Sequence, residues 1–92
     1  MKKEIYKEKT TIKQKSHLQN ERELILINDD HHTFDYVIDA LIDVCNHTTE
    51  QATQCAMITH YKGQCEIKKG QFNVLRLMRK ALTDRELRVK IN

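Results

Sequence analysis

Tryptophan and proline are absent from this chain, and only five of its 92 residues are aromatic, although 32% are charged. A chain of this length forms one domain, whose core must be small and mainly aliphatic. No apolar run approaches the ~20 residues that a membrane-spanning helix needs. The basic start, MKKEIYKEKTTIKQK, is not followed by the apolar segment of a secretory signal. We therefore expect a cytoplasmic protein with no membrane partner.

The chain has three cysteines, Cys45, Cys55 and Cys65, and they form no CxxC motif. An odd number without this motif argues against a disulfide framework and for a reducing compartment. The spacing between these cysteines and the histidines does not match a structural zinc site, so we expect no metal and no cofactor. Cys45 and Cys55 should be small buried hydrophobic residues, not nucleophiles. We expect no enzymatic activity.

Basic residues are missing from the middle of the chain. Residues 24–61 contain six acidic residues and no Lys or Arg, whereas residues 62–92 contain nine basic and three acidic residues. The basic residues of the last helix are not interleaved with aromatic residues or with an RNA-binding signature. Solvated helix faces commonly carry such charges. We therefore do not expect a nucleic-acid partner.

The chain divides into two parts, residues 1–22 and residues 23–92. The first part has no apolar period of 2 or 3.6 and predicts a flexible arm. Apolar periodicity in the second part predicts an α+β domain in the order β-α-α-β-α-β, with three helices packed on a small, three-stranded antiparallel sheet. The predicted strands are 24–28, 64–67 and 87–91, and the predicted helices are 33–46, 48–63 and 71–82.

Three details of these elements can be tested in a structure. Thr33 and Thr48 are expected to be the N-caps of the first two helices. A turn made of Lys68, Lys69 and Gly70 is expected between the second strand and the last helix. That helix should direct four apolar side chains inward: Phe72, Leu75, Met78 and Leu82.

Two of the predicted elements end in polar residues. The first strand is followed by Asn28, Asp29 and Asp30. The second helix ends at Gly63, a natural left-handed C-cap, which places His60 in the last turn. If these two ends meet, several hydrogen-bond acceptors surround a small space beside apolar walls. Such a site suits a cation with several N–H donors, such as the α-ammonium group of a polypeptide.

Four short motifs carry a family resemblance: Ile27-Asn28-Asp29-Asp30, Val37-Ile38-Asp39, Ala52-Thr53-Gln54 and His60-Tyr61-x-Gly63. With these motifs the chain resembles the ClpS family, the adaptors that hand substrates to Clp protease unfoldases. The resemblance covers residues 24–63 without a gap and fades beyond Gly63. The chain is several residues shorter around its third helix than typical bacterial members.

The resemblance implies binding of the first residue of polypeptides that carry an N-degron, the degradation signal of the N-end rule. The residues that match the family's α-amino site are Asn28, Asp29, Asp30 and His60. The residues that match its hydrophobic pocket, which usually takes Leu, Phe, Tyr or Trp, are His32, Phe34, Val37, Ile38, Ala56, Thr59 and Leu87. Taken alone, Asp29 and Asp30 would also suit the caps of a turn or helix, and His60 would suit a structural role at a helix end.

The resemblance also implies two partners for a monomeric adaptor. One is the N-terminal domain of a Clp AAA+ unfoldase of the ClpA or ClpC type, and the other is the N-degron polypeptide. The alternative is a protein-interaction module of the same fold that modulates a Clp unfoldase without recognising free N-termini.

Three of the matched positions differ from the family pattern. His32 stands where members have a threonine, Ala56 where they often have a methionine, and Thr59 where they have an aliphatic residue. We expect these differences to change the substrate preference more than the mode of binding.

Overall fold

The structure is a computed structural model that describes residues 20–92, so the predicted arm lies almost entirely outside the described residues. The elements, in chain order, are β1 (Arg22–Ile27), α2 (Phe34–Cys45), α3 (Thr49–Lys62), β2 (Gln64–Gly70), α4 (Phe72–Asp84) and β3 (Arg88–Ile91). The strand order in the sheet is β2-β1-β3, and β1 pairs antiparallel with both neighbours. The predicted α+β class and the β-α-α-β-α-β order are confirmed.

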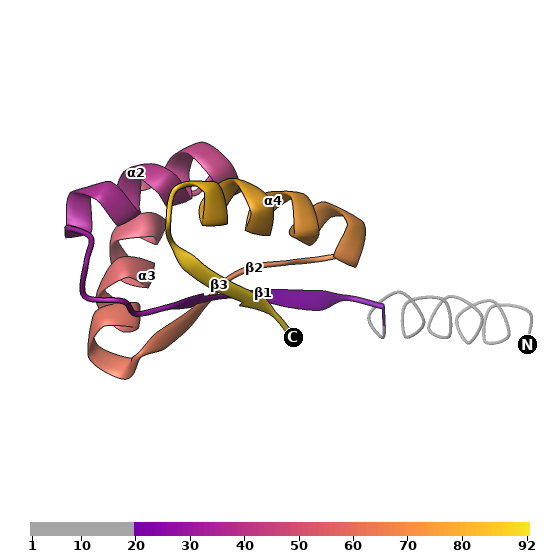
Figure 1. Ribbon diagram of the computed structural model, residues 1–92, viewed down its shortest axis with the longest axis horizontal. Helices are drawn as coiled ribbons and strands as arrows, with labels where there is room; N and C mark the ends of the chain where they lie inside the picture. Colours follow the sequence, from indigo (N-terminus) through magenta and orange to yellow (C-terminus); the bar gives the residue numbers. More distant parts are fainter. Residues whose placement is uncertain (1–19) are drawn as a thin grey trace, which may run out of the picture.

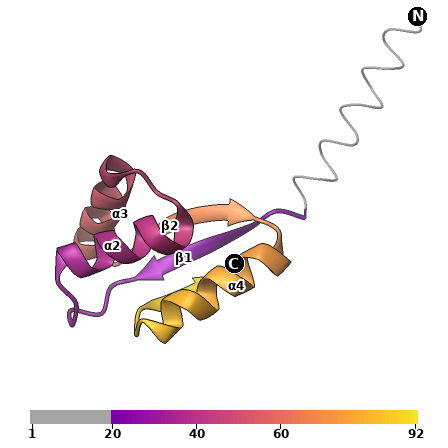
Figure 2. The ribbon, with the colours of Figure 1, turned by 90° about the horizontal axis from the view of Figure 1, so that it is seen from above.

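The three helices lie on one face of the sheet (Figure 1). Seen from above, β1 runs toward the end of the molecule where α2 begins (Figure 2). The core between the helices and the sheet is aliphatic, as the composition predicts, and consists of Leu24, Leu26, Ala40, Leu41, Cys45, Ala52, Cys55, Ile67, Leu75, Leu82 and Leu87. None of the helices in residues 20–92 has both the length and the apolar character needed to cross a membrane.

Local hydrogen bonds fix the ends of the first two helices. The Thr33 hydroxyl accepts from the Tyr36 N–H and the Thr48 hydroxyl accepts from the Gln51 N–H, each at 3.1 Å. Both threonines are therefore N-caps, as predicted. Gly63 ends α3 in the left-handed conformation, with φ of 91°. A residue without Cβ adopts this conformation at little cost, so the helix stops where the sequence predicts.

The second strand is longer than the sequence predicts. Lys68, Lys69 and Gly70 do not form a turn; they continue β2 and pair with β1, as far as Arg22 opposite Gly70. The register shifts between Leu24 and Ile25, which marks a β-bulge. The prediction was wrong because two lysines followed by a glycine favour a turn in isolation, whereas β2 is an edge strand, where exposed lysines are well tolerated.

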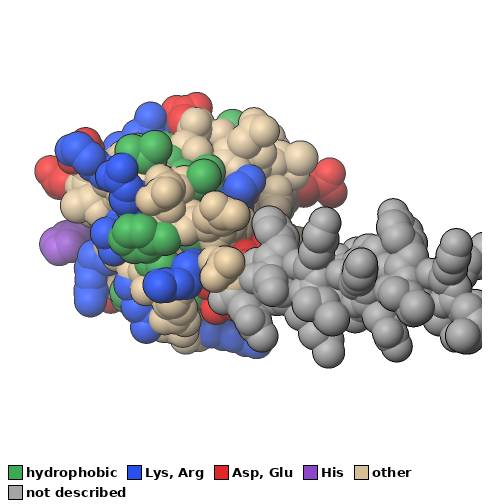
Figure 3. Space-filling view, turned by 90° about the vertical axis from the view of Figure 1, so that its right-hand side faces the viewer, with side chains coloured by type: hydrophobic (Ala, Val, Ile, Leu, Met, Phe, Trp, Pro, Cys, Tyr) green, Lys and Arg blue, Asp and Glu red, His purple; other side chains and the backbone are tan. Residues whose placement is uncertain are grey.

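Phe72 also differs from its prediction, because it is 42% exposed and not part of the core. It is the first residue of α4 and lies beside Arg22, the first residue of β1. The guanidinium groups of Arg22 and Arg79 lie 5.8 and 5.9 Å from its ring centre. Figure 3 views the end of the molecule where β1 and α4 begin, and there Lys and Arg side chains lie around exposed hydrophobic ones.

Candidate functional site

A cavity of about 210 Å³ lies where β1 ends, between the start of α2 and the end of α3. Its lining consists of Leu26, Ile27, Asn28, Asp29, Asp30, His32, Thr33, Phe34, Val37, Ala56, Thr59, His60 and Leu87. Clefts for whole small molecules typically measure ~300–1,000 Å³. This cavity therefore suits one side chain and the adjoining end of a polypeptide better than a large ligand.

The structure brings ten of the eleven predicted site residues into this lining. The exception is Ile38, which packs against the hydrophobic core. Three lining residues were not predicted. Leu26 and Ile27 are the last residues of β1, and Thr33 is the N-cap of α2, so their positions next to Asn28 and Phe34 could have indicated them.

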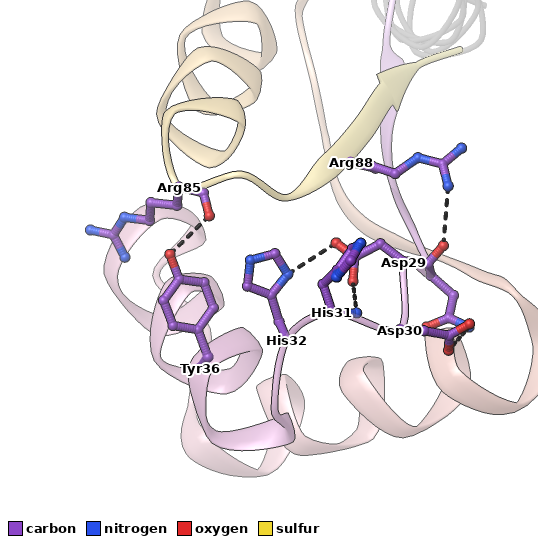
Figure 4. Close-up of polar contacts among 8 residues, drawn as sticks. Asp29, Asp30, His31, His32, Tyr36, Arg85 and Arg88 are labelled. Carbon is purple, nitrogen blue, oxygen red and sulfur yellow. Dashed lines mark hydrogen bonds and ion pairs between the residues drawn. The ribbon is translucent and has the colours of Figure 1, made fainter.

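A backbone hydrogen bond joins the two sides of the predicted α-amino site. The Asn28 N–H donates to the Gly63 carbonyl at 3.0 Å, which fixes the end of β1 against the end of α3. The Arg88 guanidinium of β3 donates to the Asn28 carbonyl at 3.4 Å (Figure 4). Asn28 and His60 therefore face a common space, although 32 residues separate them in the sequence.

The Asn28 side chain is oriented by its neighbour Asp30. The Asn28 amide Nδ2 donates to Asp30 Oδ1 at 3.1 Å. This contact uses a side-chain N–H of Asn28 and leaves the side-chain oxygen Oδ1 of Asn28 as an acceptor. Asp30 has a positive φ of 61°, a conformation that Asp adopts more readily than most residues. The conformation of Asp30 thus places its carboxylate beside the side-chain amide of Asn28 at the end of the cavity.

Asp29 has both carboxylate oxygens engaged by its own chain (Figure 4). Oδ1 accepts from the His31 N–H at 3.1 Å, and Oδ2 lies 3.0 Å from His32 Nδ1. Burial raises the pKa of Asp29, but the hydrogen bonds from His31 and His32 and the attraction to His32 outweigh burial and lower it below its ordinary value. Since the carboxylate is ionised at neutral pH, His32 Nδ1 is the donor. Asp29 therefore contributes negative charge and holds the loop, with its oxygens already paired.

A second set of contacts ties α2 to the turn before β3. The Tyr36 ring stacks on His32, with ring centres 4.7 Å apart, and its hydroxyl donates to the Arg85 carbonyl at 2.8 Å. Figure 4 shows the Tyr36 side chain reaching the turn that carries Arg85, with the ring of the loop residue His32 beside it. Leu87 follows that turn and is buried in the cavity wall. The sequence did not indicate Tyr36, because its partner is distant along the chain.

The remaining walls of the cavity are apolar. Val37 and Ala56 contribute aliphatic surface, and Thr59 is buried with its hydroxyl donating to the Cys55 carbonyl at 2.7 Å. That bond satisfies the hydroxyl proton within α3, so Thr59 adds little polarity to the wall. Phe34 is 45% exposed and packs edge-to-face on His60, with ring centres 5.3 Å apart. These two rings form the rim.

The arrangement supplies acceptors and negative charge at one end of an apolar pocket. Its lining contains a histidine–aspartate pair, but no serine or cysteine that this pair could activate. Cys45 and Cys55 belong to the core, as predicted.

His47 is buried and its Nε2 donates to the Ile67 carbonyl at 2.7 Å. Within residues 20–92, no three His, Cys, Asp or Glu side chains are grouped to hold a metal ion.

Comparison with known proteins places this chain among the adaptors of ATP-dependent proteases. Residues 17–90 match the family described as ATP-dependent Clp protease adaptor protein ClpS. The ATP-dependent Clp protease adapter protein ClpS of Acetivibrio thermocellus is 30% identical over 87 residues, which cover 86% of this chain and 88% of that protein. The chain belongs to the ClpS family, as its motifs predict, and is an adaptor of a Clp protease.

A solved structure shows the same fold. Agrobacterium tumefaciens ClpS2, bound to L-phenylalaninamide, superimposes with a TM-score of 0.75 at 19% sequence identity. The match covers 79% of this chain and 95% of that chain. At this identity the likeness shows that the two proteins share a fold.

Proposed function

We propose that this adaptor binds the free α-amino group and hydrophobic first side chain of N-degron polypeptides and delivers them to a Clp AAA+ unfoldase of the ClpA or ClpC type. The observation that carries the proposal is the cavity at the end of β1. There the acceptors of Asn28, Asp30 and His60 lie beside an apolar pocket of one-side-chain size. The Agrobacterium relative supports it, because L-phenylalaninamide has a free α-amino group and an apolar side chain.

The α-amino group fits the polar end for electrostatic reasons. An α-ammonium has three N–H donors and an ordinary pKa of about 7.7–8.0, so it is largely charged near neutrality. The Asn28 amide oxygen, the Asp30 carboxylate and a neutral His60 ring nitrogen can accept from it. The nearby Asp29 carboxylate adds negative potential, which favours the charged amine. An acetylated N-terminus has no such charge and offers a single donor.

The first side chain would occupy the apolar end of the cavity. Val37, Ala56, Thr59 and Leu87 would contact it, and Phe34 would cover it from the rim. Burial of a Leu or Phe side chain contributes about 1.5–3 kcal/mol. Affinity then depends on two conditions together, a free amine and an apolar first residue.

Fluorescence anisotropy with labelled peptides tests this function. We expect saturable binding of peptides that begin with free Leu or Phe, and loss of binding for the acetylated copies. A leading Asp or Gly should also bind weakly, because the apolar pocket is then unfilled. Equal binding of free and acetylated peptides would instead favour a protein-interaction module that does not recognise free N-termini.

The variant His60→Ala tests the site itself. Loss of one acceptor for a buried charged group costs about 1–3 kcal/mol, so the dissociation constant should rise roughly 5- to 150-fold. His31→Ala is the matched control, because His31 is an exposed histidine of the same region that does not line the cavity. If both variants bind the Leu peptide as tightly as the unaltered protein, the cavity is not the α-amino site.

A further inference from the structure

The three cysteines, none of which has a role in the proposed function, lie together between α2, α3 and β2. All three thiols are free. Cys45, at the end of α2, is 0% exposed, and Cys55, on α3, is 9% exposed. Cys65, on β2, is half-buried and packs against the same core. Because β2 is an edge strand, Cys65 is the thiol that a small reagent can reach.

The lengths of the two chain segments place Cys55 and Cys65 at the same height along the axis of α3. From Cys55 to the end of α3 at Lys62 the helix rises ~10 Å, at about 1.5 Å per residue. Gly63 reverses the chain, and from Lys62 to Cys65 an extended segment returns by ~10 Å, at about 3.3 Å per residue. Cys65 lies two residues before the buried Ile67 on β2 and packs against the same core, so its side chain is on the face that the helices cover. The two thiols therefore face each other across the corner between α3 and β2.

The electrostatics of Cys55 reflect this proximity. Burial raises the pKa of Cys55 to about 12, and the neighbouring Cys65 thiol adds to the rise, as a hydrogen-bond partner and then as a nearby charge. Cys45 is a weaker influence on the same thiol. Burial also raises the pKa of Cys45, to about 11. Cys65 is accordingly the neighbour most closely coupled to Cys55.

We propose that Cys55 and Cys65 form a reversible disulfide that links α3 to β2 when the protein meets a low-molecular-weight disulfide oxidant. The Cys65 thiolate attacks one sulfur of the oxidant, forming a mixed disulfide and releasing one thiolate. Cys55 then loses its proton to solvent, a step that its raised pKa makes slow at neutral pH, and attacks the Cys65 sulfur, which releases the second thiolate. Two protein thiols are oxidised and one small disulfide is reduced to two thiols.

The disulfide would close a ring around the corner that carries part of the cavity. The enclosed residues 56–64 include Ala56, Thr59 and His60, which line the cavity, and Gly63, which accepts the hydrogen bond from Asn28. Oxidation would thus lock this corner in its folded conformation. The inference concerns the thiols and the corner alone, so it stands independently of peptide binding.

Peptide mapping of the full chain tests the link. The protein is incubated with millimolar glutathione disulfide, remaining thiols are blocked with N-ethylmaleimide, and the chain is cut with trypsin and Glu-C. Cleavage after Glu50, Lys62 and Glu66 places Cys45, Cys55 and Cys65 in three separate fragments. We expect fragments 51–62 and 63–66 to be joined, and dithiothreitol to separate them. A link from Cys45 to Cys55, a dimer through Cys65, or stable glutathionylation without closure would each overturn the proposal.

Thermal unfolding provides a second measurement and does not depend on a variant that might not fold. Closing this loop should raise the melting temperature of the oxidised protein by roughly 5–15 °C over that of the reduced protein. Cys65→Ser should abolish both the linked fragment and the shift, whereas Cys45→Ala should retain both. A linked fragment that lowers the melting temperature would show that the folded geometry does not accommodate the disulfide, which would overturn the proposal.

Discussion

At the scale of single residues, Asp29 holds the loop that leads from β1 into α2. Its two oxygens accept from the His31 N–H and from His32, and His32 in turn stacks on Tyr36. Folding lowers the pKa of Asp29, because these bonds outweigh the effect of burial. The ionised carboxylate is therefore a source of stability, as well as a source of negative potential near the cavity.

This pKa shift predicts a pH-dependent stability. A carboxyl group with a lowered folded pKa adds stability above its unfolded pKa of about 3.9, and that stability is lost as the pH falls through the folded value. We expect Asp29→Asn to be less stable than the unaltered protein at pH values near 7. Urea unfolding at decreasing pH should show the two stabilities converging below about pH 4. A difference that stays constant under acidic conditions would show that the charge of Asp29 is not what stabilises the loop.

Ala56 determines how much of the cavity is filled. It is 4% exposed, lies one helical turn before His60, and contributes only a methyl group to the wall. Each methylene-equivalent of lost contact costs about 0.8 kcal/mol of apolar burial. The space beside Ala56 should therefore admit β-branched first residues that a longer side chain at this position would exclude. Phe34, at the rim, refills part of that space.

We predict that discrimination between Leu or Phe and Ile or Val is weak, and that Ala56→Met sharpens it. The measurement is the ratio of dissociation constants for four peptides that differ only in the first residue. Met57→Ala is the matched control, because Met57 is 47% exposed on the same helix and does not line the cavity. The prediction fails if the unaltered protein already rejects Ile and Val, or if Ala56→Met leaves the ratio unchanged.

At the scale of elements, the end of α3 organises the site. Gly63 closes the helix with φ of 91°, and its carbonyl accepts the Asn28 N–H. His60 lies one turn earlier, so its position depends on where this helix stops. The single residue that ends α3 thereby sets both the orientation of a predicted acceptor and the contact between α3 and β1.

Gly63→Ala should destabilise the protein by about 1–2 kcal/mol, the cost of the left-handed conformation for a residue with Cβ. The cost is conformational, because a Cβ at this position would meet no atom within 4 Å. Gly70→Ala is the control, since Gly70 has no positive φ and a Cβ there would make an ordinary contact of 3.7 Å with Leu75. Urea unfolding that gives equal stabilities for the two variants would contradict this account of α3.

At the scale of the whole molecule, the cavity and the start of the described chain lie at opposite ends of β1. This strand has six residues, so Arg22 is ~20 Å from Asn28. The segment before residue 20 therefore joins the domain far from the proposed peptide site. If the protein delivers substrates to an unfoldase, we expect residues 1–19 to act in delivery and not in peptide binding.

We predict that removal of residues 1–19 leaves peptide affinity unchanged and slows degradation of an N-degron substrate by the cognate Clp unfoldase and protease. The truncation keeps Arg22 and thus all of β1. Anisotropy measures the first effect, and loss of a fluorescent substrate measures the second. A large drop in peptide affinity would show that these residues belong to the binding site.

The sequence by itself determined the features that depend on local chemistry. Apolar periodicity predicted the element order, threonines predicted the starts of α2 and α3, and Gly63 predicted the end of α3 with His60 in its last turn. These signals are readable because a cap or an amphipathic stripe involves residues at most a few positions apart. With Asn28, Asp29 and Asp30 after β1, they also predicted the polar end of the cavity, whereas the residues of its apolar walls were implied by the resemblance to the ClpS family.

The tertiary structure alone decided the features that depend on distant partners. Lys68 and Lys69 lie in a strand because β1 is beside them, and Phe72 lies beside Arg22 at the start of β1 and is exposed. Tyr36 reaches the Arg85 carbonyl 49 residues away, and Arg88 reaches the Asn28 carbonyl from 60 residues away. Neither member of such a pair carries a local signal of the other, so only the folded chain shows how the loop around the cavity is held.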